Sequence, residues 1–196
     1  MRHGMKIGRT IAAAVFSLAI SNFLSIGGQA QTPQRAPGAA PAKAPAAATS
    51  TGVVTANLLQ LMRGTLYPAS NVIFAAQNQD PAKIPPAKDP ATASDPLAST
   101  YGQWLAVENS ALAISEVANL LMVRGRKCAN GRDVPLRNAD WAKFVQGLRD
   151  AGQTAYKAAQ SKNQDTIVDA AGTLSEACSN CHDKYREKPK MEDRCM

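Results

Sequence analysis

Apolar side chains recur at helical intervals in four stretches of the chain, and none of these stretches alternates as a half-buried strand does. The first stretch covers 53–79, the second 97–126 and the fourth 163–188, while the third begins at a capping residue, Asn138 or Asp140. Four amphipathic helices bury their apolar faces most simply against one another. The pattern therefore predicts an all-α protein, an antiparallel four-helix bundle.

Prolines and basic residues modify this outline. Pro68 lies inside the first stretch and is expected to kink or break that helix, because it lacks a backbone donor. Further prolines predict a long surface connection between the first two helices: Pro81, Pro85, Pro86, Pro90 and Pro96. Three basic residues suit the negative end of the second helix dipole: Arg124, Arg126 and Lys127.

The apolar faces of three helices are expected to point into the bundle. In the second helix the residues are Tyr101, Trp104, Leu105, Leu112, Leu121 and Met122. In the third they are Trp141, Phe144, Val145, Leu148, Ala151, Ala155 and Ala158. In the fourth they are Ile167, Val168, Ala171, Leu174, Cys178, Cys181, His182 and Tyr185.

Residues 1–30 have the pattern of a secretory signal peptide. Arg2, Lys6 and Arg9 precede an apolar stretch, and Gly28 and Ala30 supply the small residues of a cleavage site. The apolar stretch is shorter than the roughly 20 residues that span a bilayer comfortably, although an uncleaved membrane anchor is the alternative. Either way the rest of the chain is expected to be exported, and we predict a periplasmic protein that is soluble after cleavage.

The next segment, 31–52, consists almost entirely of Ala, Pro, Thr, Ser and Gly. Regularly spaced prolines prevent a continuous helix there, and the small side chains bury too little surface to offset the entropy of ordering. We predict a flexible tether at 31–52, a folded domain at 53–190 and a short tail at 191–196.

Length and charge exclude several functional classes. A chain of 196 residues is too short for a two-domain enzyme with a separate cofactor-binding half. The formal net charge of +7 falls to +4 without residues 1–30, and no basic run is interleaved with aromatic residues. The sequence therefore does not favour nucleic-acid binding.

The fourth helix contains the sequence Cys178-Ser179-Asn180-Cys181-His182. This C-x-x-C-H spacing is typical of covalent haem c attachment, in which two thiols bind one porphyrin edge and the imidazole binds the iron. On a helix the three side chains lie at i, i+3 and i+4, so they share one face. The motif predicts one covalently bound haem on the C-terminal helix.

Three other interpretations of the cysteines fit less well. A thioredoxin-like dithiol favours the start of a helix beside a sheet, whereas this pair lies deep in a helical stretch. A structural zinc site needs more ligands, and Cys128 and Cys195 lie far apart in the sequence. A disulfide between Cys178 and Cys181 would be strained on a regular helix.

The histidine count restricts the iron ligands. The chain has two histidines, and His3 is removed with the predicted signal peptide, which leaves His182. Two histidine ligands from one mature chain are therefore excluded if cleavage occurs. The sixth iron position is left to methionine, lysine, another side chain, an exogenous molecule or nothing.

The motif and its position near the end of a four-helix chain resemble the class II c-type cytochromes, the cytochrome c′ and cytochrome c-556 family. The resemblance covers roughly 53–188, and its other segments are Leu61-Met62 through Pro68, Leu120-Leu121-Met122 before Gly125-Arg126, and Asp140-Trp141. It implies that His182 is the proximal iron ligand and that Arg186 lies near the exposed edge of its ring. It also implies a homodimer through the first two helices, which the interruption at Pro68 makes less favourable.

In this family a residue of the first helix faces the iron from the distal side. Leu59 would leave the iron five-coordinate, whereas Met62 would supply a sixth ligand, and the register of the helix decides between them. Met122 is the other buried methionine, while Met191 and Met196 lie in a polar tail and are expected to be poor ligands.

These observations predict a non-enzymatic, periplasmic cytochrome that transfers one electron through a single haem c. Basic residues after the motif are expected to favour an acidic redox partner: Lys184, Arg186, Lys188 and Lys190. The alternative is a five-coordinate haem protein that binds NO or CO. A peroxidase is less favoured, because the mature chain has no second histidine for acid-base chemistry.

Cys128 and Cys195 remain outside the haem motif. In an oxidising compartment they can pair with each other, stay as two thiols or form an intermolecular bridge. An internal bridge would tie the C-terminal tail to the loop after the second helix.

Overall fold

The computed structural model describes residues 53–196, and the predicted signal peptide and tether lie outside the described residues. The chain folds as an all-α bundle, and the described residues contain no strand beyond an isolated bridge between Lys127 and Asp133. The helices are α1 (Leu58–Leu61), a π-helical turn (Met62–Leu66), α2 (Tyr67–Asn78), α3 (Gln103–Leu120), α4 (Ala139–Ser161) and α5 (Gln164–Tyr185). None of the helices in this part of the chain is long and apolar enough to cross a membrane.

The segments α1, the π-helical turn and α2 follow one another without a break and form the first helix of the bundle. A capping box starts it at Asn57, whose side chain accepts from the Gln60 backbone N–H while the Gln60 side chain accepts from the Asn57 N–H. The periodicity predicted a helix from residue 53, whereas helical structure begins at Leu58.

Pro68 was expected either to kink or to break the first helix, and the structure shows that it does not break it. It lies in the first turn of α2, directly after the π-helical turn in which the Tyr67 N–H donates to the Met62 carbonyl. A proline cannot donate to the carbonyl four residues earlier, and its ring crowds that carbonyl. The wider turn just before Pro68 accommodates the ring, so the helix continues to Asn78.

The second helix is shorter than its apolar pattern predicted, because α3 begins at Gln103 and ends at Leu120. The connection between α2 and α3 contains three short 3-10 turns, and the last of them lies where the second helix was expected to begin: Pro81–Lys83, Pro90–Thr92 and Pro96–Ala98. Tyr101 and Leu105 were expected to face inward, but both side chains are exposed, as is Val168 on α5. Gly102 is required where the connection meets α3, since a Cβ there would lie 2.4 Å from the Leu97 carbonyl oxygen.

Arg126 lies beyond the end of α3 and is buried, with 5% of its surface exposed. Its Nε donates to the Leu120 carbonyl at 2.9 Å and its Nη1 to the Ala56 carbonyl at 2.5 Å. The side chain therefore caps α3 from outside the helix and ties it to the start of the first helix. Arg124 and Lys127, expected in the same role, are exposed loop residues.

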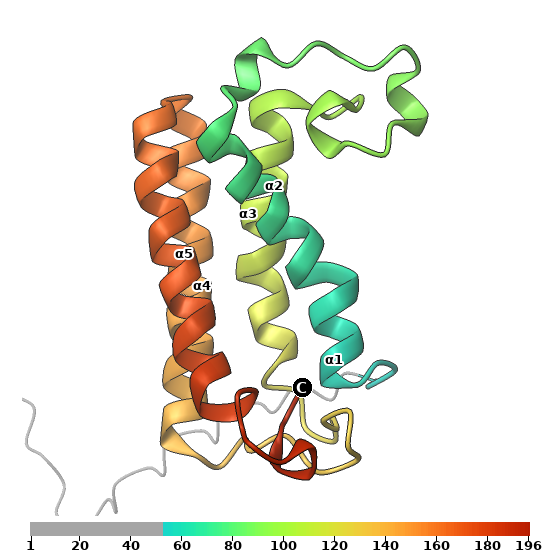
Figure 1. Ribbon diagram of the computed structural model, residues 1–196, viewed down its shortest axis with the longest axis vertical. Helices are drawn as coiled ribbons and strands as arrows, with labels where there is room; N and C mark the ends of the chain where they lie inside the picture. The colour runs from blue at the N-terminus through green and yellow to red at the C-terminus, as the bar shows by residue number, and fades with distance from the viewer. Residues whose placement is uncertain (1–52) are drawn as a thin grey trace, which may run out of the picture. The chain divides into compact units, whose positions relative to one another are not determined.

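The helices α4 and α5 are joined by Lys162 and Asn163 and lie side by side (Figure 1). The side chain of Asn163 caps α5 by accepting from the backbone N–H groups of Asp165 and Thr166. Gly152 lets α3 and α4 approach closely, because a Cβ there would lie 2.8 Å from the Ser115 backbone nitrogen. The first helix contacts α3 and α5, which completes the bundle around one apolar core.

Candidate functional site

A cavity of about 750 Å³ opens between the first helix, the start of α4 and the last turns of α5. All the residues that the sequence singled out for cofactor binding line it: Leu59, Met62, Cys178, Cys181, His182 and Arg186. Most of the remaining lining is apolar and includes Leu58, Leu66, Phe74, Leu121, Trp141 and Leu174. The fold thus gathers residues from opposite ends of the folded chain around one hydrophobic space.

The two thiols of the motif are free and partly buried at this cavity. Burial raises the pKa of Cys178, and burial together with the nearby Cys178 and Asp140 raises the pKa of Cys181 to about 11. Both groups are therefore thiols at neutral pH and not the reactive thiolates of a dithiol oxidoreductase. Residues 53–196 also contain no group of three or more His, Cys, Asp or Glu side chains arranged to hold a metal ion.

His182 follows Cys181 on the same face of α5 and is partly buried. Burial lowers the pKa of its imidazole, and the charge of Arg186 lowers it further. A neutral imidazole has a lone pair free to bind a metal. Arg186 lies one turn on, where its backbone N–H donates to the His182 carbonyl at 2.7 Å and its Nε approaches Glu187 at 2.5 Å.

The first helix forms the wall of the cavity with residues spaced four apart. In a regular α-helix each step of four residues turns a side chain by roughly 40° around the axis, so such a row would drift away from the cavity. The π-helical turn at Met62–Leu66 rotates less per residue and offsets that drift. Both predicted distal residues, Leu59 and Met62, therefore line the cavity, whereas Met122 packs against the core without lining it.

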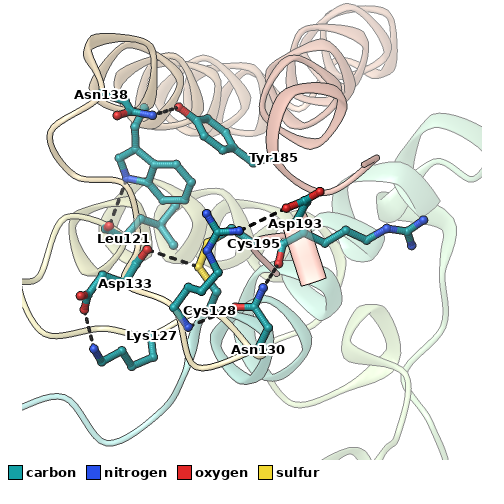
Figure 2. The surroundings of a disulfide bond; sticks show 12 residues. Leu121, Lys127, Cys128, Asn130, Asp133, Asn138, Tyr185, Asp193 and Cys195 are labelled. Carbon is teal, nitrogen blue, oxygen red and sulfur yellow. Dashed lines mark hydrogen bonds and ion pairs between the residues drawn. A yellow bond between two sulfur atoms is a disulfide. The ribbon is translucent and has the colours of Figure 1, made fainter. Parts of the chain in front are cut away.

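An aromatic cluster covers one side of the cavity. Tyr185 meets Trp141 edge to face, with ring centroids 5.0 Å apart, and Phe144 at 6.3 Å. The indole Nε1 of Trp141 donates to the Leu121 carbonyl at 3.3 Å (Figure 2), so the buried ring leaves no unpaired donor. The helical spacing of these side chains was visible in the sequence, but their mutual contacts were not.

Cys128 and Cys195 form a disulfide, which decides among the alternatives that the sequence left open. Their Cα atoms are 4.9 Å apart, within the usual range of about 4.4 to 6.8 Å for such bonds. The bond fastens the C-terminal tail to the loop after α3 (Figure 2). Met196, which lies in a polar tail in the sequence and was expected to be a poor ligand, also lines the cavity.

The site fits a flat, largely apolar cofactor held from one side. Its volume lies in the range of roughly 300–1,000 Å³ that is typical of cofactor pockets. Two thiols one helical turn apart and an imidazole are the donor types that covalent haem attachment and iron ligation require. Apolar and aromatic side chains supply the rest of the wall.

Comparison with known proteins gives one family match. Residues 135–186, which contain α4 and α5 with the cysteine motif, match the model of the family described as Cytochrome C'. The match confirms the predicted resemblance to the cytochrome c′ family over these residues, which are less than half of the chain. No curated protein and no solved structure matches the chain significantly.

Proposed function

We propose, from the match of α4 and α5 to the cytochrome c′ family, that this protein is a mono-haem c-type cytochrome that transfers one electron at a time. The observation that carries the proposal is the apolar cavity onto which Cys178, Cys181 and His182 all open. Cys178 and Cys181 would hold the haem through thioether bonds, and His182 would bind its iron. When bound, the haem supplies the Fe(III)/Fe(II) couple.

The residues around the cavity would influence the reduction potential of the iron and the rearrangement that accompanies electron transfer. The leucine side chains of the first helix and Trp141 of α4 give the cavity a largely apolar lining, and an apolar surrounding is one of the main controls on a reduction potential. Hydrogen bonds of the Tyr185 hydroxyl with Asp140 and Asn138 hold the end of α5, just after the motif, against the start of α4, which would limit rearrangement when the charge on the iron changes. The short α4–α5 connection supports the antiparallel order of the bundle.

Met62 is the sixth ligand in this proposal. Its thioether is the only sulfur that the first helix brings to the cavity, within the part of the chain that the structure describes. A low-spin iron with histidine and methionine ligands suits rapid electron transfer, because both oxidation states keep the same ligands.

We further propose that the protein works in the periplasm, is soluble after signal cleavage and has no catalytic activity of its own. Its partner would be an acidic redox protein that approaches the basic residues after the motif. Ion pairs already occupy three of these residues: Lys184 with Asp140 at 3.8 Å, Arg186 with Glu187, and Lys190 with Glu192 at 4.0 Å. Lys188 forms no ion pair within residues 53–196 and is the best candidate for partner contact. Partner reduction should slow as ionic strength rises, and an insensitive rate would contradict this part of the proposal.

A second function is favoured by the position of Leu59, which lines the same cavity one turn before Met62. If Leu59 is the residue nearest the iron, the iron is five-coordinate and open to NO or CO. The protein would then be a gas carrier, scavenger or sensor.

The absorption spectrum of the exported, haem-loaded protein tests both functions. Electron transfer with Met62 as ligand predicts a low-spin ferric spectrum with a methionine-sulfur band and a ferrous spectrum that CO leaves unchanged. A high-spin spectrum that shifts with CO would favour gas binding. The Cys178→Ser/Cys181→Ser variant should lose the covalent haem, which mass spectrometry detects directly, whereas Cys128→Ser/Cys195→Ser should keep it.

A further inference from the structure

The C-terminal tail does not leave the bundle after α5 but turns back toward the cavity. A short 3-10 turn at Met191–Asp193 reverses the chain, and the Cys195 N–H donates to the Tyr185 carbonyl at 2.9 Å. Cys195 and Met196 then line the same cavity as His182. The last two residues therefore belong to the wall of the site.

The tail is fastened at many points, whereas the last residues of a domain usually fray. Besides the Cys128–Cys195 disulfide, Nδ2 of Asn130 donates to the Glu192 and Arg194 carbonyls at 2.8 Å each. The Ala129 N–H donates to the Met196 carbonyl at 2.7 Å. Arg132 adds a hydrogen bond to the Glu192 carbonyl at 3.2 Å and an ion pair with Asp193 at 3.5 Å.

The loop that holds the tail is itself fixed to the bundle. Cys128 is buried, with 2% of its surface exposed, and the Lys127 carbonyl accepts from the Leu58 N–H at 2.8 Å. The tail is thus connected through this loop to the first turn of the first helix, which forms another wall of the cavity. Its two methionines differ in position, because Met191 is 61% exposed whereas Met196 is partly buried at the cavity.

We propose that the disulfide-fastened tail is a permanent wall of the cavity and that Met196 is the residue of this wall that restricts the access of small molecules. In the haem-loaded protein, which rests on the proposed function, the wall would limit how readily water, O₂ or CO reaches the cofactor. The flexible thioether side chain of Met196 can fill irregular space, so it is suited to restrict the passage of small molecules into the cavity.

Alkylation of Cys178 and Cys181 by iodoacetamide measures access to the cavity without any haem. The wild-type chain, exported from cells that lack the haem-attachment machinery, has only these two free thiols once its disulfide has formed. The Cys128→Ser/Cys195→Ser variant has the same two, so the rates compare directly. We expect alkylation to be several-fold faster in this variant and in Met196→Ala, and unchanged in Met191→Ala.

A Met196→Ala rate equal to that of the wild type would overturn the role of Met196. An unchanged rate in the double serine variant would overturn the wall itself. Ile167→Val is the control for lost stability, because Ile167 is buried in α5, does not line the cavity, and loses a buried methylene group in this variant. Equal acceleration in Ile167→Val would assign the effect to unfolding and contradict the proposal.

If circular dichroism shows that the haem-free chain is not helical, the same variants are compared in the haem-loaded protein by the rate at which O₂ oxidises the ferrous form. The same order of rates is expected, with Met191→Ala equal to wild type, and equal rates in all variants overturn the proposal. Failure of the proposed function is visible separately, as the absence of a haem adduct in the mass spectrum of the wild type.

Discussion

The hydroxyl of Tyr185, in the last turn of α5, donates a 2.5 Å hydrogen bond to Oδ1 of Asp140 in the first turn of α4. It also accepts from Nδ2 of Asn138 at 3.1 Å. The hydrogen bond from Tyr185 is the main reason that the pKa of Asp140 is lowered, while burial and then the same bond raise the pKa of Tyr185. This contact holds the end of the motif helix against α4, three residues after His182.

Tyr185→Phe should destabilise the fold while keeping the aromatic contacts with Trp141 and Phe144. The variant loses the hydroxyl that pairs with Asp140 and Asn138, and a lost hydrogen bond of this kind costs about 0.5–1.5 kcal/mol. Urea unfolding followed by circular dichroism measures the loss. Tyr101→Phe is the matched control, because Tyr101 is 69% exposed and should tolerate the change. Equal stability of Tyr185→Phe and the wild type would contradict the prediction.

The Asp140 carboxylate should make part of the stability depend on pH. Its pKa is lowered in the folded state, so the unfolded chain binds more protons in acid and stability rises with pH through that range. The stabilisation is complete above the ordinary aspartate pKa of about 3.9 and is lost as pH falls through the lower folded value. Urea titrations of the wild type and Asp140→Asn between acid and neutral pH should therefore converge at low pH. A stability difference that stays constant with pH would refute this role of Asp140.

Replacement of the buried Arg126 by methionine should cost more than replacement of an exposed arginine. The variant keeps most of the volume but removes the Arg126 donors to the Leu120 and Ala56 carbonyls. The Leu120 carbonyl still accepts from the Val123 N–H at 3.3 Å, so the main loss is expected at the Ala56 carbonyl, where an unsatisfied buried group costs about 1–3 kcal/mol. Arg124→Met is the control, since Arg124 is exposed in the same loop. Chemical unfolding should separate the two variants clearly, and similar unfolding midpoints would show that the Arg126 hydrogen bonds contribute little.

Met62→Leu should convert the haem-loaded protein into one that binds CO. Loss of the thioether removes the proposed sixth ligand while the apolar wall is preserved. The ferrous spectrum with and without CO measures the change, and the ferric methionine-sulfur band should disappear. Met122→Leu should behave as the wild type, because Met122 does not line the cavity. A Met62→Leu spectrum identical to that of the wild type would contradict Met62 as the sixth ligand, and it would favour gas binding only if both spectra are high-spin and shift with CO.

Local patterns in the sequence determined much of this protein. Helical periodicity predicted the all-α fold, and the spacing of Cys178, Cys181 and His182 placed them on one face of the last helix, where the structure has them. These features depend on residues a few positions apart, whose relation is fixed by helix geometry alone. The sequence predicted the ends of the helices less accurately. The second helix was expected to reach residue 126, but α3 ends at Leu120, whose carbonyl accepts a hydrogen bond from the Arg126 side chain.

Tertiary structure decided the features that depend on residues far apart in the chain. The sequence showed two spare cysteines, but only the fold brings Cys128 and Cys195, separated by 67 residues, close enough to bond. The same fold brings the Leu120 carbonyl at the end of α3 and the Ala56 carbonyl ahead of the first helix to the buried Arg126 side chain. It also brings Met196, which lies in a polar tail in the sequence, to the cavity. Local composition describes a residue's neighbours along the chain, whereas burial depends on which distant segments pack against it. The sequence alone therefore predicted Cys178, Cys181 and His182 as donors that share one helix face, and the packing of the bundle and its tail decided the walls of the cavity around them.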